Sequence, residues 1–443
     1  MFEVLRNRTY RHLFLAQVVA LVGTGLATVA LGLLAFRLAG EDAGAVLGPA
    51  LAIKTIAYVV VAPIAGAYAA RFPRKRLLVT LDVVRLLVVL VLPWVDQIWQ
   101  IYVLIFVLQS ASAAFTPTFQ ATIPEVLPKE EDYTKALSLA RLAYDLETLL
   151  SPALAAVLLT IITDQGLFMG TAVGFLGSAL LVLSVALPRP VAKTASTRIT
   201  RKLTQGMRIF LATPRLRGLL ALNLAAAAGG AMVIVNTVVI VRGELQKSDH
   251  AVALALAAFG AGSMIMAFVL PRLLERYRDR SVMLTAAGSM SILLAVLAMA
   301  WSLAERAHWG LLLGGWVLLG SSYAALVTPG GRLLKRSSRE EDRPALFSAQ
   351  FSLSHACWLI TYPLVGWLGA QAGMGMALWT MAAIATLGWI AAARFWSADD
   401  SGAPVHRHDD LPSDHPHLAE GEHSDHGHSH PFVIDEVHRR WPS

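Results

Sequence analysis

The stretch GAYAARFPRK, from Gly66 to Lys75, decides the fold, because it separates two long apolar segments and returns later in the chain. Its second copy is PRLLERYRDR, from Pro271 to Arg280, about 205 residues further on. Two more pairs keep the same order at a similar spacing: KEED at 129–132 with REED at 339–342, and TP at 116–117 with TP at 328–329. The sequence therefore predicts two parallel repeats of similar size.

The composition is that of a protein embedded in lipid. Hydrophobic residues make up 56% of the 443 residues and charged residues only 15%, with a mean hydropathy of +0.58. A soluble domain carries about a quarter charged residues. Because the alternation typical of strands is absent, helices are the structure that can satisfy the backbone inside a membrane. We therefore predict an all-α integral membrane protein.

Apolar segments of about 20 residues, enough to cross a hydrocarbon core of roughly 30 Å, define twelve predicted transmembrane helices. They are 12–36, 45–70, 76–94, 99–122, 135–162, 166–187, 216–241, 250–272, 280–302, 308–329, 345–370 and 373–396. The predicted organisation is an N-terminal six-helix bundle (1–187), a cytoplasmic linker (188–215), a C-terminal six-helix bundle (216–396) and a His-rich cytoplasmic tail without stable structure (397–443). In such repeats the substrate site lies between the halves, near the middle of the membrane.

The placement of Lys and Arg predicts that both termini are cytoplasmic. Of the 37 Lys and Arg residues, all but seven fall in segments on the side of the N-terminus. Arg37, Arg242, Lys247 and Arg306 fall on the opposite side, and Lys54, Arg85 and Arg141 fall within predicted spans. The positive-inside rule therefore predicts a multi-pass protein of the cell (inner) membrane.

The same observations exclude several function classes. The net charge of +7 comes from short basic loops, so we expect no nucleic-acid partner. A single cysteine, Cys357, excludes an internal disulfide framework or a thiolate metal cluster. Neither a catalytic motif nor a nucleotide-binding loop is found, so we expect neither an enzyme nor an ATP-driven pump, and no resident cofactor or obligate protein partner.

Twelve spans, a basic central linker and the Gly66–Lys75 stretch resemble the major facilitator superfamily. Its signature at this loop is Gly-x-x-x-Asp-Arg-x-Gly-Arg-Arg/Lys; this chain keeps Gly66, Arg71, Arg74 and Lys75 but has Ala70 in place of the acid. The resemblance implies a latch at the cytoplasmic side. The residues that it assigns to the latch, or that lie beside it, are Gly66, Arg71, Arg74, Lys75, Asp82, Arg85, Glu275, Arg276 and Arg280.

Within that superfamily the opening residues, FEVLRNRTYR, resemble those of bacterial drug, siderophore and nickel-resistance exporters. The nickel-resistance (NreB-like) exporters commonly end in a His-rich cytoplasmic tail, as this chain does. Nine of its 13 histidines lie beyond residue 400, interleaved with acidic residues. The predicted metal ligands are His406, His408, His415, His417, His423, His426, His428 and His430; His438 is the ninth. Neutral imidazole suits nickel, cobalt, zinc and copper, although a polar tail can also simply be solvated.

Ionisable residues inside the spans are candidates for transport, since a charge in the bilayer is costly. Arg141 and Asp145 are four residues apart and can pair on one helix, whereas Glu147 has no such local partner and is the stronger candidate proton carrier. The repeat spacing places His355 at the position equivalent to Asp145. A core histidine that merely forms a hydrogen bond is an equal alternative for His355. Gln17, Gln109, Asn223 and Asn236 are candidate cavity-lining residues, with interhelical hydrogen bonding as the alternative.

The leading hypothesis is a secondary active exporter of a divalent transition metal, nickel or cobalt first, driven by proton antiport and conferring metal resistance. Its partners would be the metal ion, protons and the lipid bilayer. The alternatives are a proton-driven exporter of an organic compound, such as a drug, macrolide or siderophore, and a metal sensor that does not transport. The retained twelve-helix repeat argues against the sensor.

Overall fold

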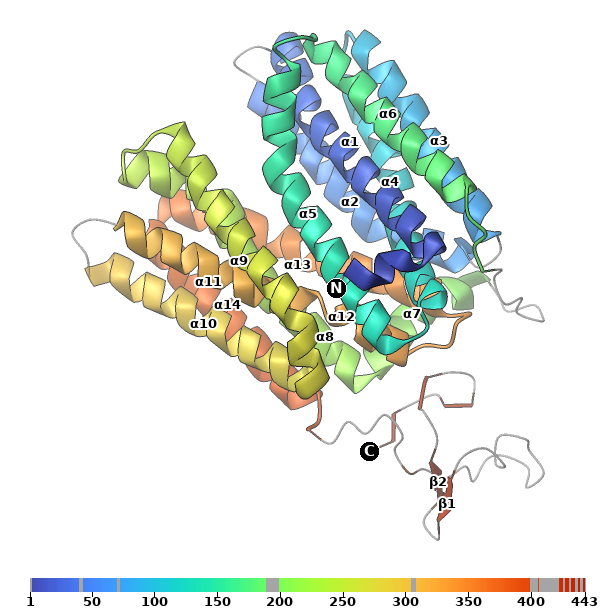
Figure 1. The fold of residues 1–443 in the computed structure, drawn as a ribbon. Coiled ribbons are helices and arrows are strands. Elements are labelled where there is room, and N and C mark those ends of the chain that lie inside the picture. The colour runs from blue at the N-terminus through green and yellow to red at the C-terminus, as the bar shows by residue number, and fades with distance from the viewer. Residues whose placement is uncertain are drawn as a thin grey trace.

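The computed structural model describes residues 2–39, 43–69, 72–188, 199–303 and 308–398 of the chain. In the tail it describes 405, 422–424, 427–429, 432–434, 437–438 and 441–442. Long helices dominate the described residues, and they gather in two groups that lean against each other (Figure 1). The predicted all-α class is confirmed.

Six long helices form the first group, the N half. They are α1 (Arg8–Ala39), α2 (Ala43–Ala69), α3 (Arg74–Val91), α4 (Ile98–Val126), α5 (Glu130–Leu158) and α6 (Asp164–Leu183). Helix α1 packs on α6 and α5, α2 packs on α4, and α3 packs on both α4 and α6. Small residues allow the closest approach: Gly23 of α1 lies against Thr171 and Gly174 of α6, where an added Cβ would press on backbone atoms.

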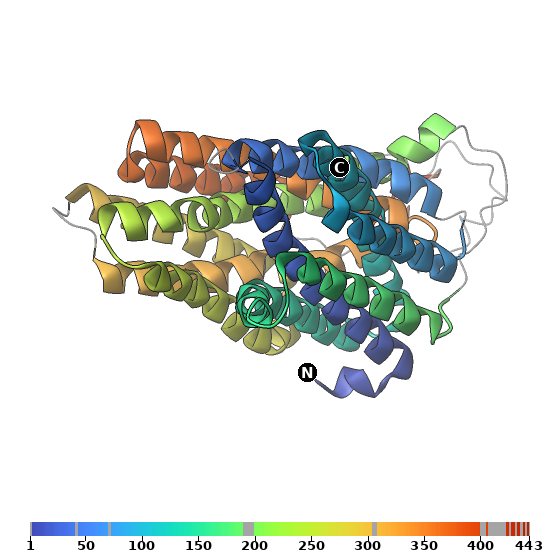
Figure 2. The same ribbon diagram turned by 90° about the horizontal axis from the view of Figure 1, so that it is seen from above.

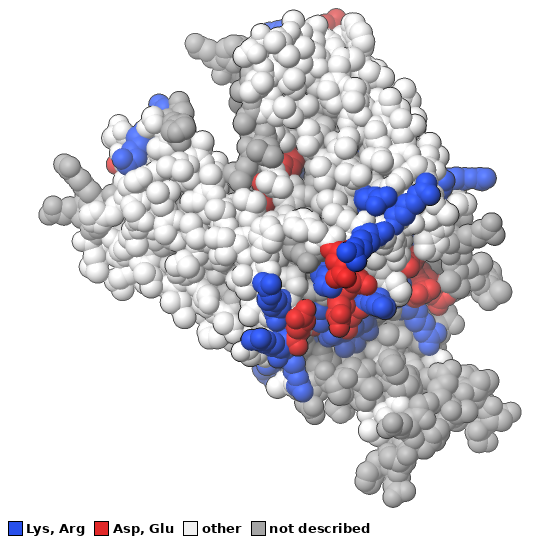
Figure 3. Space-filling view, viewed as in Figure 1, with Lys and Arg blue, Asp and Glu red and all other residues white. Residues whose placement is uncertain are grey.

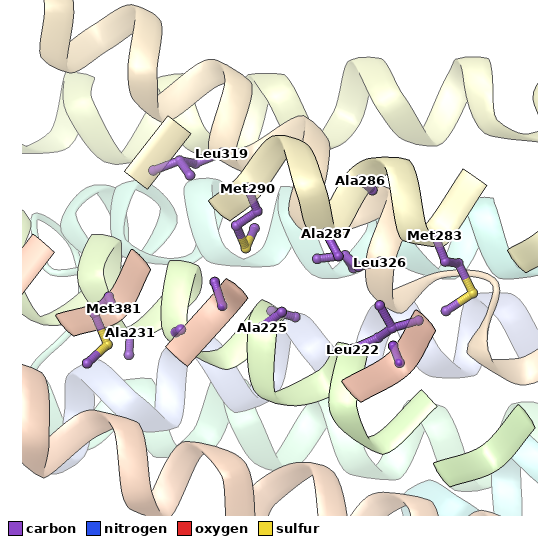
Figure 4. Packing of buried hydrophobic residues seen from close by; sticks show 14 of the residues in the cluster. Leu222, Ala225, Ala231, Met283, Ala286, Ala287, Met290, Leu319, Leu326 and Met381 are labelled. Carbon is purple, nitrogen blue, oxygen red and sulfur yellow. The ribbon is translucent and has the colours of Figure 1, made fainter. Parts of the chain in front are cut away.

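The second group, the C half, has the larger continuous core. Its helices are α8 (Pro214–Val238), α9 (Asp249–Arg276), α10 (Asp279–Leu303), α11 (Trp309–Val327), the short α12 (Gly330–Arg336), α13 (Arg343–Gln371) and α14 (Met374–Phe395); a π-helical turn, Val239–Glu244, extends α8. Helix α8 packs on α14 and α13, and α9 packs on α11. Figure 4 shows how Leu222 and Ala225 of α8 meet Met283 and Met290 of α10 in this core.

Each of the twelve predicted spans corresponds to a long helix, with ends that differ from the predicted ones by five residues or fewer in either direction. Among the described residues, nine helices are long and apolar enough to cross a membrane; α2 contributes a shorter apolar stretch, Ala52–Gly66. Helices α5 and α13 fall outside the nine because they carry more polar side chains, and both face the other half of the molecule. Large apolar side chains such as Leu303 and Ile161 are exposed, as lipid contact requires.

The predicted linker contains an additional helix, α7 (Ile199–Ala212), which packs against α13 and α2. Its Ile209 and Phe210 are buried in the core of the C half. The span predictions did not include this helix because its apolar residues occupy one face only, which keeps its overall hydropathy low.

The two halves meet along α5 with α9 and along α2 with α13. Seen from above, the helices of the two groups lie side by side along these contacts (Figure 2). Both termini lie at one end of the molecule (Figure 1). Charged side chains gather at that end in the space-filling view, and the surface is hollowed between the halves toward the opposite end (Figure 3). We call the end with the termini the closed end and the other the open end.

In the described part of the tail, β1 (Glu422–Ser424) and β2 (Gly427–Ser429) pair antiparallel. His423 lies opposite His428 in this register. These two short strands are the regular structure in the described part of the tail, and the prediction that the tail as a whole has no stable structure stays a prediction.

Candidate functional site

Helix α5 carries an ion pair that reaches across to the C half. Arg141 pairs with Asp145, as their four-residue spacing predicts. The Arg141 Nε also donates to Ser263 Oγ of α9 at 2.9 Å, and its guanidinium lies 4.9 Å from the ring of Tyr323 on α11. One arginine therefore connects α5 with two helices of the other half.

Burial explains why this pair holds together. Asp145 is only 3% exposed, and a carboxylate removed from water is tolerated when a cation and hydrogen bonds compensate for the lost hydration. Arg141 supplies both with its rigid, planar group of donors. The ion pair with Arg141 therefore accounts for the buried position of Asp145 without any role of Asp145 in transport.

Glu147 lies two residues further along α5, half-buried. Gly25 of α1 comes so close that an added Cβ would lie 3.0 Å from Glu147 Oε1. Lys54 of α2 is near enough to interact electrostatically with the Glu147 carboxylate. The Glu147 side chain therefore has a cationic neighbour from another helix, which its sequence neighbours did not reveal.

His355 of α13 faces α2 across the interface between the halves. Its ring meets Tyr58 edge-on, with centroids 4.8 Å apart, and its Nδ1 lies 2.7 Å from the Phe351 carbonyl oxygen. The backbone contact fixes the ring and leaves Nε2 as the second nitrogen. Lys54 interacts electrostatically with His355 as well, so this lysine is coupled to both a carboxylate and an imidazole.

Lys54 is the residue of this site that sequence reasoning missed. It was recognised as a charge inside a span but not as a site residue, because its neighbours come from α5 and α13, far away in sequence. Its Nζ lies 5.7 Å from the centre of the Tyr58 ring. The signal that could have found it is its position alone, since an intramembrane lysine is a functional candidate by default.

Asp145, Glu147 and His355 do not converge on one point. In the described part of the chain, no three His, Cys, Asp or Glu side chains come together as a metal-binding group. Arg141 and Asp145 form one cluster, and Glu147, Lys54 and His355 form another. Cys357 is buried and lies on a different side of α13 from His355, as predicted.

Three of the four candidate cavity residues, Gln17, Gln109 and Asn236, form hydrogen bonds to another helix. Gln109 accepts a hydrogen bond from the Tyr58 hydroxyl at 2.9 Å, and Gln17 is hydrogen-bonded to Tyr144. Asn236 is buried and donates to the Val365 carbonyl oxygen of α13. Asn223 is also buried, and its amide nitrogen has no hydrogen-bond partner among the described residues. Gln17 and Gln109 therefore border the tyrosines beside Lys54 and Glu147.

At the closed end, the N half contributes a buried ion pair between Arg74 and Glu125, 2.5 Å apart. Arg74 also interacts electrostatically with Glu340 and Arg343 of the C half. Gly66 is needed nearby, because a Cβ there would collide with Ser348 Oγ at the start of α13. Of the other predicted latch residues, Lys75 is half-buried at the start of α3, and Arg71 lies outside the described residues.

Asp82 and Arg85 form an ion pair that stays inside the N half. Ser178 of α6 donates to Asp82 at 2.8 Å, and the Arg85 guanidinium lies 4.0 Å from the ring of Phe115 and 4.6 Å from that of Phe175. Both charges are buried. The pair therefore joins α3 to α4 and α6 rather than linking the two halves directly.

The ion pairs that directly link the halves at the closed end centre on α12. Arg332 contacts Asp279 and Glu130, each at 2.9 Å, and Arg336 contacts Asp279 at 2.7 Å and pairs with Glu130 as well. Glu130 begins α5 of the N half, and Asp279 begins α10 of the C half. We call these four residues the α12 latch. Lys335 adds a bond to the Pro128 carbonyl oxygen at 2.6 Å.

The predicted second latch motif is placed differently. Glu275 and Arg276 are exposed, and neither joins the α12 latch. Arg280 donates to the carbonyl oxygens of Trp396 at 2.8 Å and Ala393 at 3.3 Å, so it caps the end of α14. The acidic latch residue of the C half is Asp279, which the motif comparison passed over.

The repeat spacing explains the choice of Asp279. The offset is 205 residues at the Gly66–Lys75 stretch, which brings Arg74 to Asp279. It is 210 to 212 residues at the KEED and TP pairs, which brings Glu125 to the stretch 335–337 that holds Arg336. The pair Arg74–Glu125 of the N half thus corresponds to the pair Asp279–Arg336 of the C half, with the basic and acidic partners exchanged. Glu130 and Glu340 are equivalent in the KEED and REED stretches, and each approaches the ion pair of the other half.

Replacing Glu130 by Gln is expected to loosen the closed end. A carboxylate that bridges two arginines contributes on the order of 1–2 kcal/mol, which corresponds to roughly tenfold in an opening equilibrium. Leu137 lies under Gly331 of α12 and can be replaced by cysteine in a Cys357→Ser background as a reporter. We expect its alkylation by a maleimide to become about tenfold faster.

Glu131→Gln is the matched control, because Glu131 is exposed one residue away on the same helix. If both variants leave the alkylation rate at position 137 unchanged, the α12 latch does not hold the halves together.

Few of the predicted metal ligands of the tail can be placed. His406, His408, His415, His417, His426 and His430 lie outside the described residues. His423 lies on β1, and His428, on β2, is buried. Their assignment as ligands stays a prediction.

The fold and its central polar groups define a class: a helical membrane protein of two halves with ionisable residues at their interface. The sequence profile of the Major Facilitator Superfamily matches residues 13–240 and 219–420. The chain belongs to this superfamily of transporters and, like its members, is not an enzyme.

A curated relative and several solved structures are similar to the chain. The uncharacterized MFS-type transporter YfiS of Bacillus subtilis (strain 168) is 28% identical over 124 residues, which span 28% of this chain and 30% of that protein. The match thus covers less than a third of that relative. A bacterial homologue of the iron transporter ferroportin, in an outward-facing state, aligns over 87% of this chain and 99% of its own at a TM-score of 0.75 and 16% identity.

The human organic anion transporter MFSD10 aligns over 87% of this chain and 99% of its own, at a TM-score of 0.73 and 13% identity. The ferroportin homologue with soaked iron gives a TM-score of 0.71 at 15% identity, over 87% and 98% of the two chains. At these identities the similarity establishes the shared fold.

Proposed function

We propose that the protein is a secondary active exporter of a divalent transition metal, nickel or cobalt first and zinc or copper as further options, driven by proton antiport. The observation that carries the choice of cargo is the tail, in which nine histidines are interleaved with acidic residues. Imidazole is a good ligand for these ions, and closely spaced histidines in a flexible segment can present two nitrogens to one ion. The tail would collect metal at the cytoplasmic mouth.

The interface between the halves supplies groups that suit ion exchange. Glu147 and His355 each interact electrostatically with Lys54, so a cation is already within reach of an acid and an imidazole. A metal ion that enters from the cytoplasm would compete with that positive charge, and protons would take its place after release. Asp145 would stay paired with Arg141 and hold α5 against the C half.

The arrangement of the halves favours a route by alternating access. With the termini in the cytoplasm, as the Lys and Arg placement predicts, the closed end would be cytoplasmic and the open end would face outward. Export then requires the α12 latch to open for loading and to close before release. The resemblance to nickel-resistance exporters and the fold shared with a ferroportin homologue that was soaked with iron support a metal as cargo.

The cellular test is metal accumulation. Cells that express the protein are expected to hold less nickel and cobalt than cells that express Glu147→Gln at the same level. Equal metal contents in the two strains would refute metal export.

A second strain separates the tail from the membrane part. Replacing the eight histidines between 406 and 430 by serine leaves the rest of the tail intact. If the tail collects metal for transport, export at low metal concentration falls while export at saturating metal is kept. Unchanged export at both concentrations would reduce the tail to a metal buffer.

A second candidate cargo is an organic compound. Two groups of aromatic rings lie beside the charges: Tyr58 and Phe351, with centroids 5.0 Å apart, near Lys54, and Tyr323, Trp358 and Tyr362, with successive centroids 6.2 and 4.9 Å apart, near Arg141. Aromatic rings with a few charges are typical of sites for organic ligands. In the accumulation test this cargo would leave nickel and cobalt contents unchanged.

A further inference from the structure

The end of the tail lies in the core of the C half. Phe432 and Ile434 are each 2% exposed and belong to the same buried cluster as Leu216 and Leu219 of α8. Burial of two such side chains is worth roughly 1.5–3 kcal/mol each. These residues therefore behave as part of the folded protein, although they follow a long polar stretch.

The segment also has contacts of its own. The Phe432 ring meets His438 with centroids 4.4 Å apart and Trp441 at 5.0 Å, both edge-on. His438 is buried as well. Three rings from eleven residues at the end of the chain thus form one compact group.

Arg215 joins this group to the latch. The side chain is buried near the start of α8, and its guanidinium lies 5.1 Å from the ring of Trp441. The same guanidinium donates to Ser337 Oγ at 2.8 Å and to the Arg336 carbonyl oxygen at 3.4 Å. Ser337 is the residue that ends α12, and the Arg336 side chain belongs to the α12 latch.

We propose that the C-terminal segment, through its described residues 432–434, 437–438 and 441–442, is an intramolecular ligand of the C half that holds α12 in its latched position through Trp441 and Arg215. An aromatic ring over a buried arginine limits the positions that the guanidinium can take, and the guanidinium in turn fixes the end of α12. Docking of the segment therefore favours the state that is closed at this end. The inference does not depend on the identity of the cargo.

A consequence concerns the histidines between the two attachment points. The chain leaves the membrane part near Ala398, whose carbonyl oxygen accepts a hydrogen bond from Arg278 at 3.4 Å, and it returns at Phe432. The chain is thus attached to the C half at Ala398 and again at Phe432. Undocking of the segment would release the attachment at Phe432 and would loosen the α12 latch at the same time.

Docking can be tested by cleavage with chymotrypsin after Phe432 in the full-length protein in nanodiscs. We expect Trp441→Ala and Arg215→Ala each to accelerate this cleavage about tenfold, because each removes one side of a partly desolvated cation–π contact. The matched controls are Val405→Ala, which alters an exposed tail side chain, and Arg217→Ala, which removes the same charge from the same helix but faces Phe395.

The effect on the latch is read in the same variants from alkylation of cysteine at position 137. Trp441→Ala is expected to raise that rate several-fold although Trp441 contacts neither Leu137 nor Glu130. The proposal is overturned if cleavage after Phe432 is equally fast in the wild type and in both variants. It is also overturned if cleavage accelerates while alkylation at position 137 stays at the wild-type rate, since the segment then docks without acting on α12.

Discussion

Replacing Glu147 by Gln is expected to abolish metal transport driven by a pH gradient while the protein stays folded. The amide keeps the size of the side chain but cannot release a proton, and no other carboxylate was found beside Lys54 in the described structure. If Glu147 is the group on which protons and metal alternate, removing its charge breaks the coupling. Exchange of metal for metal across the membrane, which needs no proton, should persist at a reduced rate.

The control for this variant is Glu131→Gln, which removes a carboxylate from the exposed start of the same helix. Purified protein in proteoliposomes allows gradient-driven uptake and metal–metal exchange to be measured on the same sample. A Glu147→Gln protein that still responds to the pH gradient as the wild type does would remove Glu147 from the coupling mechanism.

Replacing Arg141 by Ala is expected to have the largest effect on stability. Asp145 would be left buried without its cation, which costs about 3–5 kcal/mol in buried ion pairs, against a total of about 5–15 kcal/mol for a typical protein. The hydrogen bond to Ser263 and the contact with Tyr323 would be lost as well, so the contacts of Arg141 with α9 and α11 would disappear. Transport should fall to background.

Thermal unfolding of the purified variants measures the stability. The double variant Arg141→Ala/Asp145→Ala removes both charges and should recover most of the lost stability, because no lone carboxylate remains. It should not recover transport, since the contacts to the C half are still missing. A single Arg141→Ala protein as stable as the wild type would show that the pair does not compensate for burial of Asp145.

The helical architecture followed from the sequence because hydropathy and the repeated loop motif are local signals. Both depend on whether a segment lies in lipid or in the cytoplasm, and not on which helices pack against it. The Arg141–Asp145 pair was predictable for the same reason, since one turn of one helix brings the two together. The amphipathic α7 was missed, because a helix that buries one face against other helices does not need a long apolar run.

The contacts between helices were beyond this kind of reasoning. Lys54 comes within electrostatic reach of Glu147 and His355 only because α2 packs against α13 and α5 carries the acid nearby. The acidic residue of the α12 latch was predictable, since the repeat spacing maps Arg74 onto Asp279. The prediction instead chose Glu275 and Arg276, because they restore the acidic and basic residues of the family signature. In the tail, Phe432 and Ile434 are apolar residues that follow a polar, histidine-rich stretch. This local signal for burial was available in the sequence, but the prediction treated the tail as one segment.

The central claim is that protons drive a divalent metal ion out of the cytoplasm. The most direct measurement is uptake into inside-out membrane vesicles, across nickel, cobalt, zinc and copper, with and without a pH gradient. An acidic vesicle interior is predicted to drive accumulation of nickel or cobalt, and collapse of the gradient should stop it. Metal uptake that is no greater than in vesicles without the protein, or that is indifferent to the gradient, would contradict the account.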